Sequence, residues 1–481
     1  MTQALQPGVP RRRRALFGLL DADGWGWAFV KAFFWFIVII FLLGYIPDRA
    51  YYFTVNQTLD LGILAWSPVN LCPPTNKNLP CPPPFGAVVP WEESPTEILL
   101  PSPRTDGALV TAGTKLIYIG GSDGTKATPD VWVAETVPVG NFDKWQPGPA
   151  LPAPRADAAV TSFGGAIYVS GGLDDKGAPT KTTFVLTPNL STGQLGQWQT
   201  GKDLQQSLDL PEARTGGTLV ALADGLLFAG GEGPNGVSAT TWKSKVNNGV
   251  LGAWQQQADL AAPLADTTSA LVGNYVWLIG GRDTKGPTAA VERGTVAQSG
   301  DQQGKVTQWA TNSGQNLPAP RTNSAGILST GTIYIVGGND GSGSRGEVYW
   351  TAPISGPNGD QLDVWRHLAV DDLPAPGVEG GSATVSGSTL FVTGGRHGSQ
   401  VAADTVRADL APQQPFFQLG LVGATVPALK INGELGQQLG YLNAAGAGTV
   451  NFIILLIIGW AFAHRERTRA FFERMRARRR R

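Results

Sequence analysis

The chain has 481 residues, and its 37 Lys and Arg against 37 Asp and Glu give a formal net charge of zero. With 15% charged and 42% apolar residues it does not read as a disordered chain, and 63 Gly with 35 Pro disfavour a helical bundle. The lack of net positive charge disfavours a nucleic-acid binder. These limits leave a loop-rich, all-β protein of one large domain or two or three smaller ones.

The N-terminal region predicts a membrane anchor. A basic segment, 1–24, precedes the apolar segment 25–46, whose one charge is Lys31. Its 22 residues suffice to cross a hydrocarbon core of about 30 Å as a helix, and the Lys31 stem can reach back to the interface. A cleaved signal peptide is the alternative, but this segment is longer than a signal h-region and rich in Trp and Phe. We expect an uncleaved transmembrane helix.

The C-terminal region predicts a second anchor. Residues 444–463 are uncharged and mostly apolar, and the tail 464–481 holds nine Arg and two Glu. Both apolar segments therefore have their basic flank toward the chain terminus. The positive-inside rule then places both termini in the cytoplasm and the chain between the two helices on the exoplasmic side of a cell membrane. We expect the Arg-rich tail to contact anionic lipids.

The chain has two cysteines, Cys72 and Cys81, both in a Pro-rich linker at 47–90. On the exoplasmic side a disulfide between them can form and persist, and two free thiols are the alternative. A metal site is disfavoured because no further Cys or nearby His completes a ligand set. We expect no cofactor.

The middle of the chain is a sixfold repeat. A short apolar run closed by a Gly-Gly pair recurs six times, with the second Gly at Gly121, Gly172, Gly231, Gly281, Gly338 and Gly395. A Pro-containing signal such as LPAPR precedes each run, ending at Arg104, Arg155, Arg214, Leu264, Arg321 and Gly377. The distance from signal to second Gly is 17 residues in five repeats and 18 in the sixth. A Trp follows the pair in five repeats. This regularity predicts one structural unit per repeat.

Each repeat is expected to form four short strands, and six such units around a ring form a β-propeller. The Gly-Gly pair fits a crowded position or a positive φ, and the Trp is expected to fill space between neighbouring sheets. The order of Pro-Arg signal, apolar strand with Gly-Gly, variable loop and Trp strand resembles the kelch repeat over residues 91–418. The resemblance implies a six-bladed, all-β propeller, and we expect the two predicted transmembrane α-helices to flank it.

Closure of the ring has a candidate strand. The sixth repeat ends without a Trp, whereas Trp91 stands 13 residues before Arg104, a distance like those in the other repeats. We predict that the strand around Trp91 is the outer strand of the sixth blade, which would remove a sheet edge. The alternative is that Phe416 and Phe417 fill this place alone.

The kelch resemblance also suggests that the protein could be an enzyme, because some kelch propellers are enzymes. Galactose-oxidase-like members bind copper through two His and a Tyr that is crosslinked to a Cys, but the propeller has no Cys after Cys81. Its two histidines, His367 and His397, are expected in packing or loop positions. Sialic-acid-mutarotase-like members also have six repeats, with Arg and Glu converging on the central channel. That resemblance makes carbohydrate binding or modification the alternative to a purely binding role.

One face of the propeller is the candidate binding surface. The antiparallel strand order brings the loops after the Gly-Gly pairs and the blade-to-blade connections to the same face. The candidate residues are Arg104, Arg155, Arg214, Arg321, Asp123, Asp174, Glu232, Arg282, Asp340 and Arg396, with Asp175, Asp283 and Arg345 beside them. Such a mixture can bind a sugar acid through bidentate arginines. The alternative is structural, with the repeated Arg joining neighbouring blades through backbone carbonyls.

The return segment 419–443 is short and apolar and is expected along the membrane interface. Small residues follow at intervals of four: Gly436, Gly440, Ala444 and Gly448. On a helix they form one stripe that lets a second helix approach closely, and a chance pattern facing lipid is the alternative.

These features favour a membrane-anchored, exoplasmic binding or assembly module over an enzyme. Expected partners are membrane lipids and another membrane or envelope protein, with a glycan as the alternative and no nucleic acid. The two ends hold 14 basic and 4 acidic residues, which leaves 23 basic and 33 acidic residues outside, a net charge of −10. The neutral total therefore conceals an acidic exterior that disfavours anionic partners.

Overall fold

The computed structural model describes residues 33–35, 88, 91–93 and 99–410, except 138–140, 190–191, 248–249, 330, 357–358, 368, 370–371 and 387–388. The chain divides into two compact units. One unit, Gly86–Pro412, contains the propeller. The other consists of Met1–Phe85 and Gln413–Arg481, of which the helical residues 33–35 are described.

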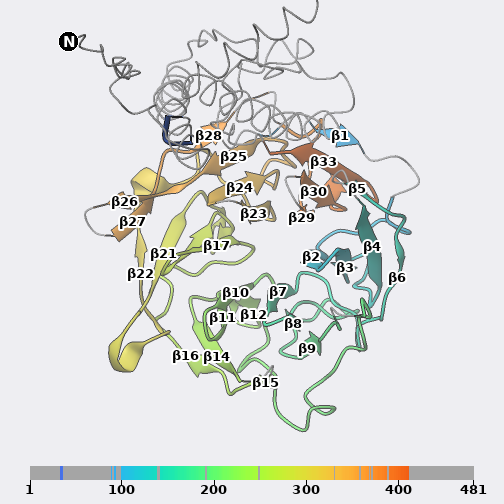
Figure 1. Ribbon diagram of the computed structural model, residues 1–481, viewed down its shortest axis with the longest axis horizontal. Coiled ribbons are helices and arrows are strands. Elements are labelled where there is room, and N and C mark those ends of the chain that lie inside the picture. Colours follow the sequence, from blue (N-terminus) through green and yellow to red (C-terminus); the bar gives the residue numbers. More distant parts are fainter. Residues whose placement is uncertain are drawn as a thin grey trace, which may run out of the picture. The chain divides into compact units, whose positions relative to one another are not determined.

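The propeller unit is a ring of six antiparallel blades (Figure 1). Blade 1 contains β2 (Ala108–Ala112), β3 (Lys115–Ile119), β4 (Val131–Val137), β5 (Asn141–Phe142) and β6 (Gln146–Pro147). Blade 2 contains β7 (Ala159–Phe163), β8 (Ala166–Ser170) and β9 (Thr183–Leu186), and its fourth strand is reduced to the bridge between Val185 and Gln199. Blade 3 contains β10 (Thr218–Leu222), β11 (Gly225–Ala229), β14 (Thr241–Asn247), β15 (Val250–Leu251) and β16 (Gln255–Gln256).

The other three blades follow the same order. Blade 4 contains β17 (Thr268–Val272), β18 (Tyr275–Ile279), β21 (Val291–Val296) and β22 (Val306–Thr311). Blade 5 contains β23 (Ala325–Ser329), β24 (Thr332–Val336), β25 (Val348–Thr351) and β28 (Arg366–His367), with the added hairpin β26 (Pro353–Gly356) and β27 (Gly359–Leu362). Blade 6 contains β29 (Ser382–Ser386), β30 (Thr389–Thr393), β33 (Thr405–Asp409) and β1 (Glu92–Glu93).

Short elements decorate the loops. Three two-stranded hairpins follow the Gly-Gly pairs of blades 3, 4 and 6: β12 (Glu232–Gly233) with β13 (Gly236–Val237), β19 (Arg282–Asp283) with β20 (Gly286–Pro287), and β31 (Arg396–His397) with β32 (Gln400–Val401). Two 3₁₀ turns, η4 (Gly300–Gln302) and η5 (Ser313–Gln315), lie in the loop and connection around β22.

The core is divided among the contacts between neighbouring blades. The second strands read as continuous apolar runs because both faces of each strand are covered by an adjacent blade. In β3, Ile117 and Ile119 pack toward β8 of blade 2, whereas Leu116 and Tyr118 pack with Phe391 of blade 6. Six such clusters join the six pairs of neighbouring blades.

The repeated Trp residues lie in these clusters, as the sequence predicts. They are Trp145, Trp198, Trp254, Trp309 and Trp365. Some of them also bond to the connection that leads into their own blade. Trp198 Nε1 donates to the Pro149 carbonyl at 2.8 Å, and Trp365 Nε1 donates to the Gln315 carbonyl at 2.9 Å.

The Gly-Gly pairs are required by a close approach between blades. Gly120 and Gly121 have φ values of 64° and 89°, and a Cβ on Gly120 would lie 2.4 Å from the Arg155 carbonyl oxygen of the next blade. The same oxygen accepts a hydrogen bond from Gly121 N at 2.8 Å. Equivalent bonds join every blade to the next, so the pair is a device for holding the ring together.

The strand around Trp91 closes the ring, as predicted. Glu92 and Glu93 of β1 pair with Arg407 and Val406 of β33, and Trp91 packs against the cluster between blades 5 and 6. Phe416 and Phe417, the alternative closure, lie outside the described residues.

We expect Trp91→Ala to lower the stability of the propeller by about 2–4 kcal/mol, because it removes a large side chain from an interblade cluster. Thermal unfolding followed by intrinsic Trp fluorescence measures this loss. Val364→Ala, at an exposed position, is the matched control. A midpoint for Trp91→Ala equal to that of the control would contradict closure by β1.

Several predictions fall on residues outside the described part of the chain. They are the Cys72–Cys81 disulfide, the small-residue stripe from Gly436 to Gly448, and the two transmembrane segments apart from residues 33–35. Among the residues that the structure describes, no helix has the length and apolar character needed to span a membrane.

Candidate binding site at the propeller axis

A ring of six equivalent residues surrounds the axis where each connection enters its first strand. Each lies two positions after the end of its Pro-containing signal, or three in the sixth repeat, and each has a positive φ between 51° and 63°. The six are Asp106, Asp157, Gly216, Asp266, Asn323 and Gly380. Gly, Asn and Asp are the residue types that tolerate this conformation best, so the backbone selects them.

Backbone hydrogen bonds join this ring. Asp157 N donates to the Asp106 carbonyl at 2.7 Å, and Asp266 N donates to that of Gly216 at 2.7 Å. Asp106 N donates to Gly380 at 2.8 Å, which continues the ring across the closure between blades 6 and 1. At five of the six steps the left-handed conformation therefore aligns a peptide of one blade with that of the next, and it brings the ring side chains together near the axis.

The carboxylates of Asp106, Asp157 and Asp266 consequently lie close together. Burial raises the pKa of Asp106 to about 6, opposed by a hydrogen bond from Thr105. Burial also raises the pKa of Asp157 well above its ordinary value, and the negative charges of Asp266 and Asp106 raise it further. Thr215 Oγ1 donates to Asp157 Oδ2 at 2.5 Å, and this hydrogen bond partly offsets the rise in the pKa of Asp157. Holding like charges together in this way costs stability, which is typical of functional sites.

A second tier of side chains follows the Gly-Gly pairs. The residue after each pair forms a bridge with the residue just before the ring in the same blade. Arg282 donates from Nε to Asp266 and from a terminal nitrogen to Glu232, each at 2.5 Å. Burial raises the pKa of Asp266, and the charge of Arg282 opposes that rise. The positive charge of Arg396 likewise opposes the rise in the pKa of Asp106.

We call this group the axial cluster: Asp106, Asp157, Asp266, Glu232, Glu379, Arg282 and Arg396. It combines five carboxylates with two guanidinium groups, so acceptors exceed donors and the formal charge is negative. Such a site can hold an amine, a guanidinium or a set of hydroxyl groups by hydrogen bonding. Within the described part of the chain, no group of three or more His, Cys, Asp or Glu side chains is arranged to hold a metal ion.

The sequence-predicted residues divide into three sets. Glu232, Arg282 and Arg396 belong to the axial cluster. Asp123, Asp174 and Asp340 lie in the turns that follow the Gly-Gly pairs, and their carboxylates accept hydrogen bonds from backbone N–H groups two to four residues further on. These three, with Asp283, stabilise their own turns.

The four repeated arginines form the third set and lie away from the axial cluster, inside the blades. Each is at most 5% exposed, and each guanidinium lies 4.8–5.3 Å from the centroid of an aromatic ring in its third strand. One terminal nitrogen donates to the carbonyl of the preceding residue at 2.5–3.0 Å. The backbone of Arg104 bonds to Gly395 and Ala402 of blade 6 while its side chain contacts blade 1. These contacts favour the structural reading for Arg104, Arg155, Arg214 and Arg321.

We expect Arg321→Leu to destabilise the propeller by about 2–4 kcal/mol, because it removes a buried ion pair of 2.9 Å with Glu347 and a cation–π contact with Tyr349. Thermal unfolding of the full chain measures the loss. Arg345→Leu is the control, since Arg345 pairs with Asp340 at the surface and its loss is expected to matter little. Equal midpoints for the two variants would contradict a structural role for the repeated arginine.

The two histidines are in packing and loop positions. The ring of His367 lies beside that of Tyr349, tilted by 52° with centroids 5.4 Å apart, and its Nε2 lies 2.8 Å from Asp372 Oδ1. His397, in β31, contacts the Gly377 carbonyl at 2.6 Å and Asp404 at 3.2 Å.

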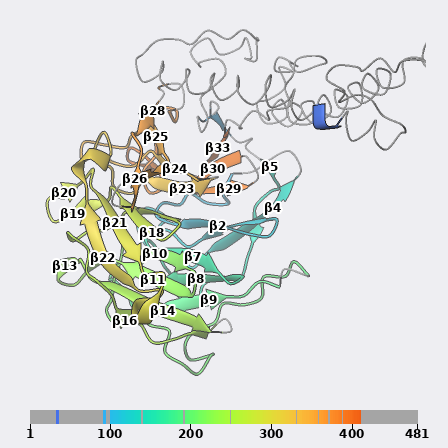
Figure 2. The same ribbon diagram turned by 60° about the vertical axis from the view of Figure 1, so that its left-hand side comes forward.

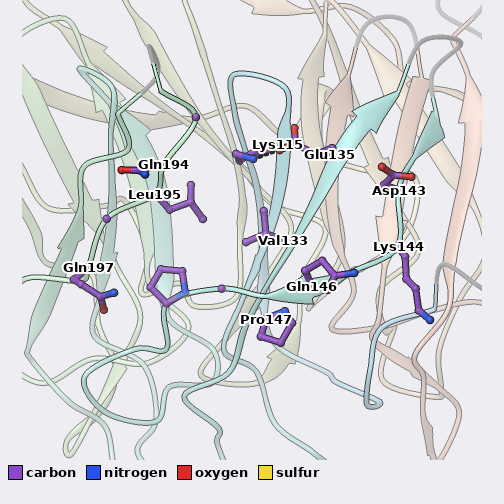
Figure 3. Close-up of a pocket in the computed structure, with 14 residues that line it drawn as sticks. Lys115, Val133, Glu135, Asp143, Lys144, Gln146, Pro147, Gln194, Leu195 and Gln197 are labelled. Atoms are coloured by element: carbon purple, nitrogen blue, oxygen red, sulfur yellow. Dashed lines mark hydrogen bonds and ion pairs between the residues drawn. The ribbon is translucent and has the colours of Figure 1, made fainter.

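A separate groove of about 750 Å³ lies between blades 1 and 2 near the propeller rim (Figure 3). Lys115 and Glu135 form an ion pair on its wall, and residues 193–197 of the blade 2 loop form the opposite side. Its charges are balanced, two Lys against one Glu and one Asp. The groove is open and shows no convergent polar group comparable with the axial cluster.

Sequence reasoning missed Asp106, Asp157, Asp266, Asn323 and Glu379. A signal was present: aligning the repeats on the Pro-containing signal, with one extra residue allowed in the sixth repeat, puts Asp, Asp, Gly, Asp, Asn and Gly in one column. The column shares a backbone conformation and not a side-chain chemistry, so a search for repeated functional groups does not find it.

Fold and cluster together define the protein class: a six-bladed β-propeller with an acid–arginine site at one end of its axis. No protein-family profile matches the sequence, and no curated protein matches it. Among solved structures, one described as "Structure of YjhT" is similar, with 15% sequence identity and a TM-score of 0.48. The similarity covers 64% of this chain and 95% of that one.

Proposed function

We propose that the protein is a kelch-type propeller anchored in a cell membrane by helices at 25–46 and 444–463, with both termini cytoplasmic and the propeller exoplasmic. The sequence supports anchoring through the length of the two apolar segments and their basic flanks. The propeller acts as a binding or assembly module, and its axial cluster receives a group of the partner.

The axial cluster carries this proposal. A purely structural ring would not need three carboxylates at equivalent positions, because Asn323, Gly216 and Gly380 satisfy the same backbone conformation without charge. The surplus of carboxylates over arginines favours a cationic group, such as a Lys or Arg side chain presented by another membrane or envelope protein. Asp157 and Asp266 are held close together beside Gly216, where a side chain would collide with the Asp266 carboxylate.

Purification of the full chain in mild detergent, followed by mass spectrometry of co-purifying proteins, tests the proposal. We expect a stoichiometric partner from the wild type, and its loss from a variant with Asp106→Asn and Asp157→Asn. A variant with Asp123→Asn and Asp174→Asn is the matched control, because it removes two carboxylates from the turns of the same face. Equal recovery from both variants would contradict binding at the axis.

Carbohydrate binding is the second candidate, favoured by the convergence of carboxylates and Arg282 on the axis. Carboxylate–arginine pairs can bind the hydroxyl groups of a sugar. The negative balance of the cluster favours a neutral or amino sugar over a sugar acid. Binding on a glycan array, without a co-purifying protein, would support this candidate over the first.

A further inference from the structure

The two faces of the propeller differ in what reaches them. The first strand of each blade starts at the axial cluster, and the second strand ends at the Gly-Gly pair on the same face. We call this the mouth face. On the opposite face the first and third strands end and the fourth strand begins, and we call it the exit face. The antiparallel order of each blade fixes this division.

Both ends of the propeller leave from the exit face of blade 6. β33 is the third strand of this blade and runs from the mouth face toward Leu410, while β1 is the fourth strand and runs in the opposite direction. Val88 and Leu410 form a bridge, so the two ends are backbone neighbours. The two segments predicted to span the membrane are therefore connected to one point of the propeller.

The exit face also carries the exposed large aliphatic side chains of the described propeller. These are Val250, Leu328, Ile354 and Val364, which are 38–57% exposed. Val250 lies in the β14–β15 hairpin, Leu328 near the end of β23, and Ile354 and Val364 in and after the hairpin of blade 5. Each position lies where a first or third strand ends or, for Val364, where the fourth strand begins. On the mouth face, the described loops expose charged residues such as Lys126, Asp175 and Lys285, and on the exit face Lys245 of blade 3 is exposed as well.

Three of these four residues belong to blade 5, which adjoins blade 6 in both views of the ring (Figures 1 and 2). The apolar side chains are thus concentrated beside the point where the chain leaves. The carboxylate next to Val364, Asp363, is paired with Arg366 at 3.0 Å, so its charge is offset.

We propose that the exit face of blade 5, through Leu328, Ile354 and Val364, rests on the lipid surface in which the chain is anchored. The axial cluster then points away from the membrane. This inference rests on the membrane anchoring proposed above and adds an orientation and a lipid-contacting surface to it.

The chemistry of the surface fits lipid better than a protein partner. A stable protein interface buries roughly 800 Å² per partner and depends on Trp, Tyr or Arg residues, whereas these are separate aliphatic side chains. Such side chains give weak insertion at a membrane interface. Weak insertion suffices here, because the covalent anchors keep the propeller near the bilayer at high effective concentration.

The segments 47–87 and 411–443 separate the predicted helices from Val88 and Leu410. Extended chains of this length would span about 100 Å or more and would permit any orientation. The orientation is therefore decided by the chemistry of the propeller surface, and the exit face of blade 5, with three exposed aliphatic side chains, is the part that favours contact with lipid.

Spin labels on the full chain test the proposal. Single Cys residues at Ile354, Val364 or Thr125, with Cys72 and Cys81 replaced by Ser, carry the label in vesicles of phosphatidylcholine and phosphatidylglycerol. We expect labels at 354 and 364 to collide more often with oxygen than with a water-soluble nickel complex. Thr125, exposed on the mouth face, is the matched control and is expected to show the reverse.

Water-like accessibility at both 354 and 364, equal to that at 125, would overturn the proposal. So would spin–spin broadening at these positions that disappears on dilution with unlabelled protein, because a second copy would then cover the face. Carbonate extraction of the same vesicles separates this result from the proposed function. Retention of the chain with water-like labels refutes the orientation alone, whereas extraction of the chain refutes the anchoring.

Discussion

Replacing Arg282 by Gln should lower the thermal midpoint of the propeller by about 4–6 °C at pH 7.5. Arg282 pairs with Asp266 and Glu232, and the Asp266 side chain is 6% exposed. Breaking a buried ion pair costs about 3–5 kcal/mol, and the partial exposure of Arg282 reduces this to about 2–3 kcal/mol. At roughly 2 °C per kcal/mol for a domain of this size, the shift is readily measured by intrinsic Trp fluorescence.

The physical reason lies in the charge that Arg282 balances. Burial lowers the pKa of Arg282, but the neighbouring carboxylates of Asp266 and Glu232 outweigh this effect and raise it above its ordinary value. Without it, Asp266 faces Asp157 and Asp106 with no adjacent cation. We expect the pKa of Asp266 to rise further, so that the variant loses less stability at pH 5 than at pH 7.5.

A double variant distinguishes charge balance from packing. Arg282→Gln with Asp266→Asn removes both members of the pair and should recover most of the lost midpoint. Failure of the double variant to recover would show that Arg282 acts through packing. Arg293→Gln is a useful control, because Arg293 lies in the same blade over the ring of Tyr275, away from the cluster.

Several features of the fold could be predicted because they recur at fixed spacing. The Gly-Gly pair and the Trp solve the same packing problem at each of six blade contacts, so the sequence repeats them. Closure by Trp91 followed from the one missing member of that series. The shortened fourth strand of blade 2 was not predictable, since a bridge at Val185 and Gln199 leaves no distinctive pattern.

The axial cluster was only partly predictable. Glu232, Arg282 and Arg396 follow Gly-Gly pairs, whose position is visible in the sequence. Asp106 and its equivalents are selected by a positive φ, so three of the six positions hold carboxylates and the other three hold Gly216, Asn323 and Gly380. The repeated Arg suggested a binding face, but Arg155 and its equivalents recur because they make the same structural contact in several blades.

Asp106 is expected to make the stability of the propeller depend on pH. Its pKa lies near 6 in the folded protein, above the ordinary Asp value of 3.8. The folded state therefore binds more protons than the unfolded state between about pH 4 and pH 6, and stability falls as the pH rises through this window. Above about pH 7 the carboxyl is ionised in both states, and the full destabilisation is present.

Asp106→Asn should therefore stabilise the propeller at pH 7.5 by about 1–3 kcal/mol and have little effect at pH 4. Asparagine suits the backbone, because Asn323 occupies the equivalent position of blade 5 with a φ of 51° against 56°. Asp123→Asn is the control of opposite sign. Hydrogen bonds from Thr125 and Lys126 lower the pKa of Asp123 to about 2, so its contribution is present at neutral pH and lost toward pH 2.

Thermal midpoints of the three proteins between pH 2 and pH 8 test this argument. Ionisation of Asp106 should lower the midpoint between about pH 4 and pH 6, whereas ionisation of Asp123 should raise it between about pH 2 and pH 4. An Asp106→Asn variant that is more stable yet no longer retains its partner would connect the cost in stability with binding. A midpoint for Asp106→Asn that falls below the wild type at pH 7.5 would show instead that the ionised ring stabilises the fold, and the case for a binding site at the axis would lose its physical basis.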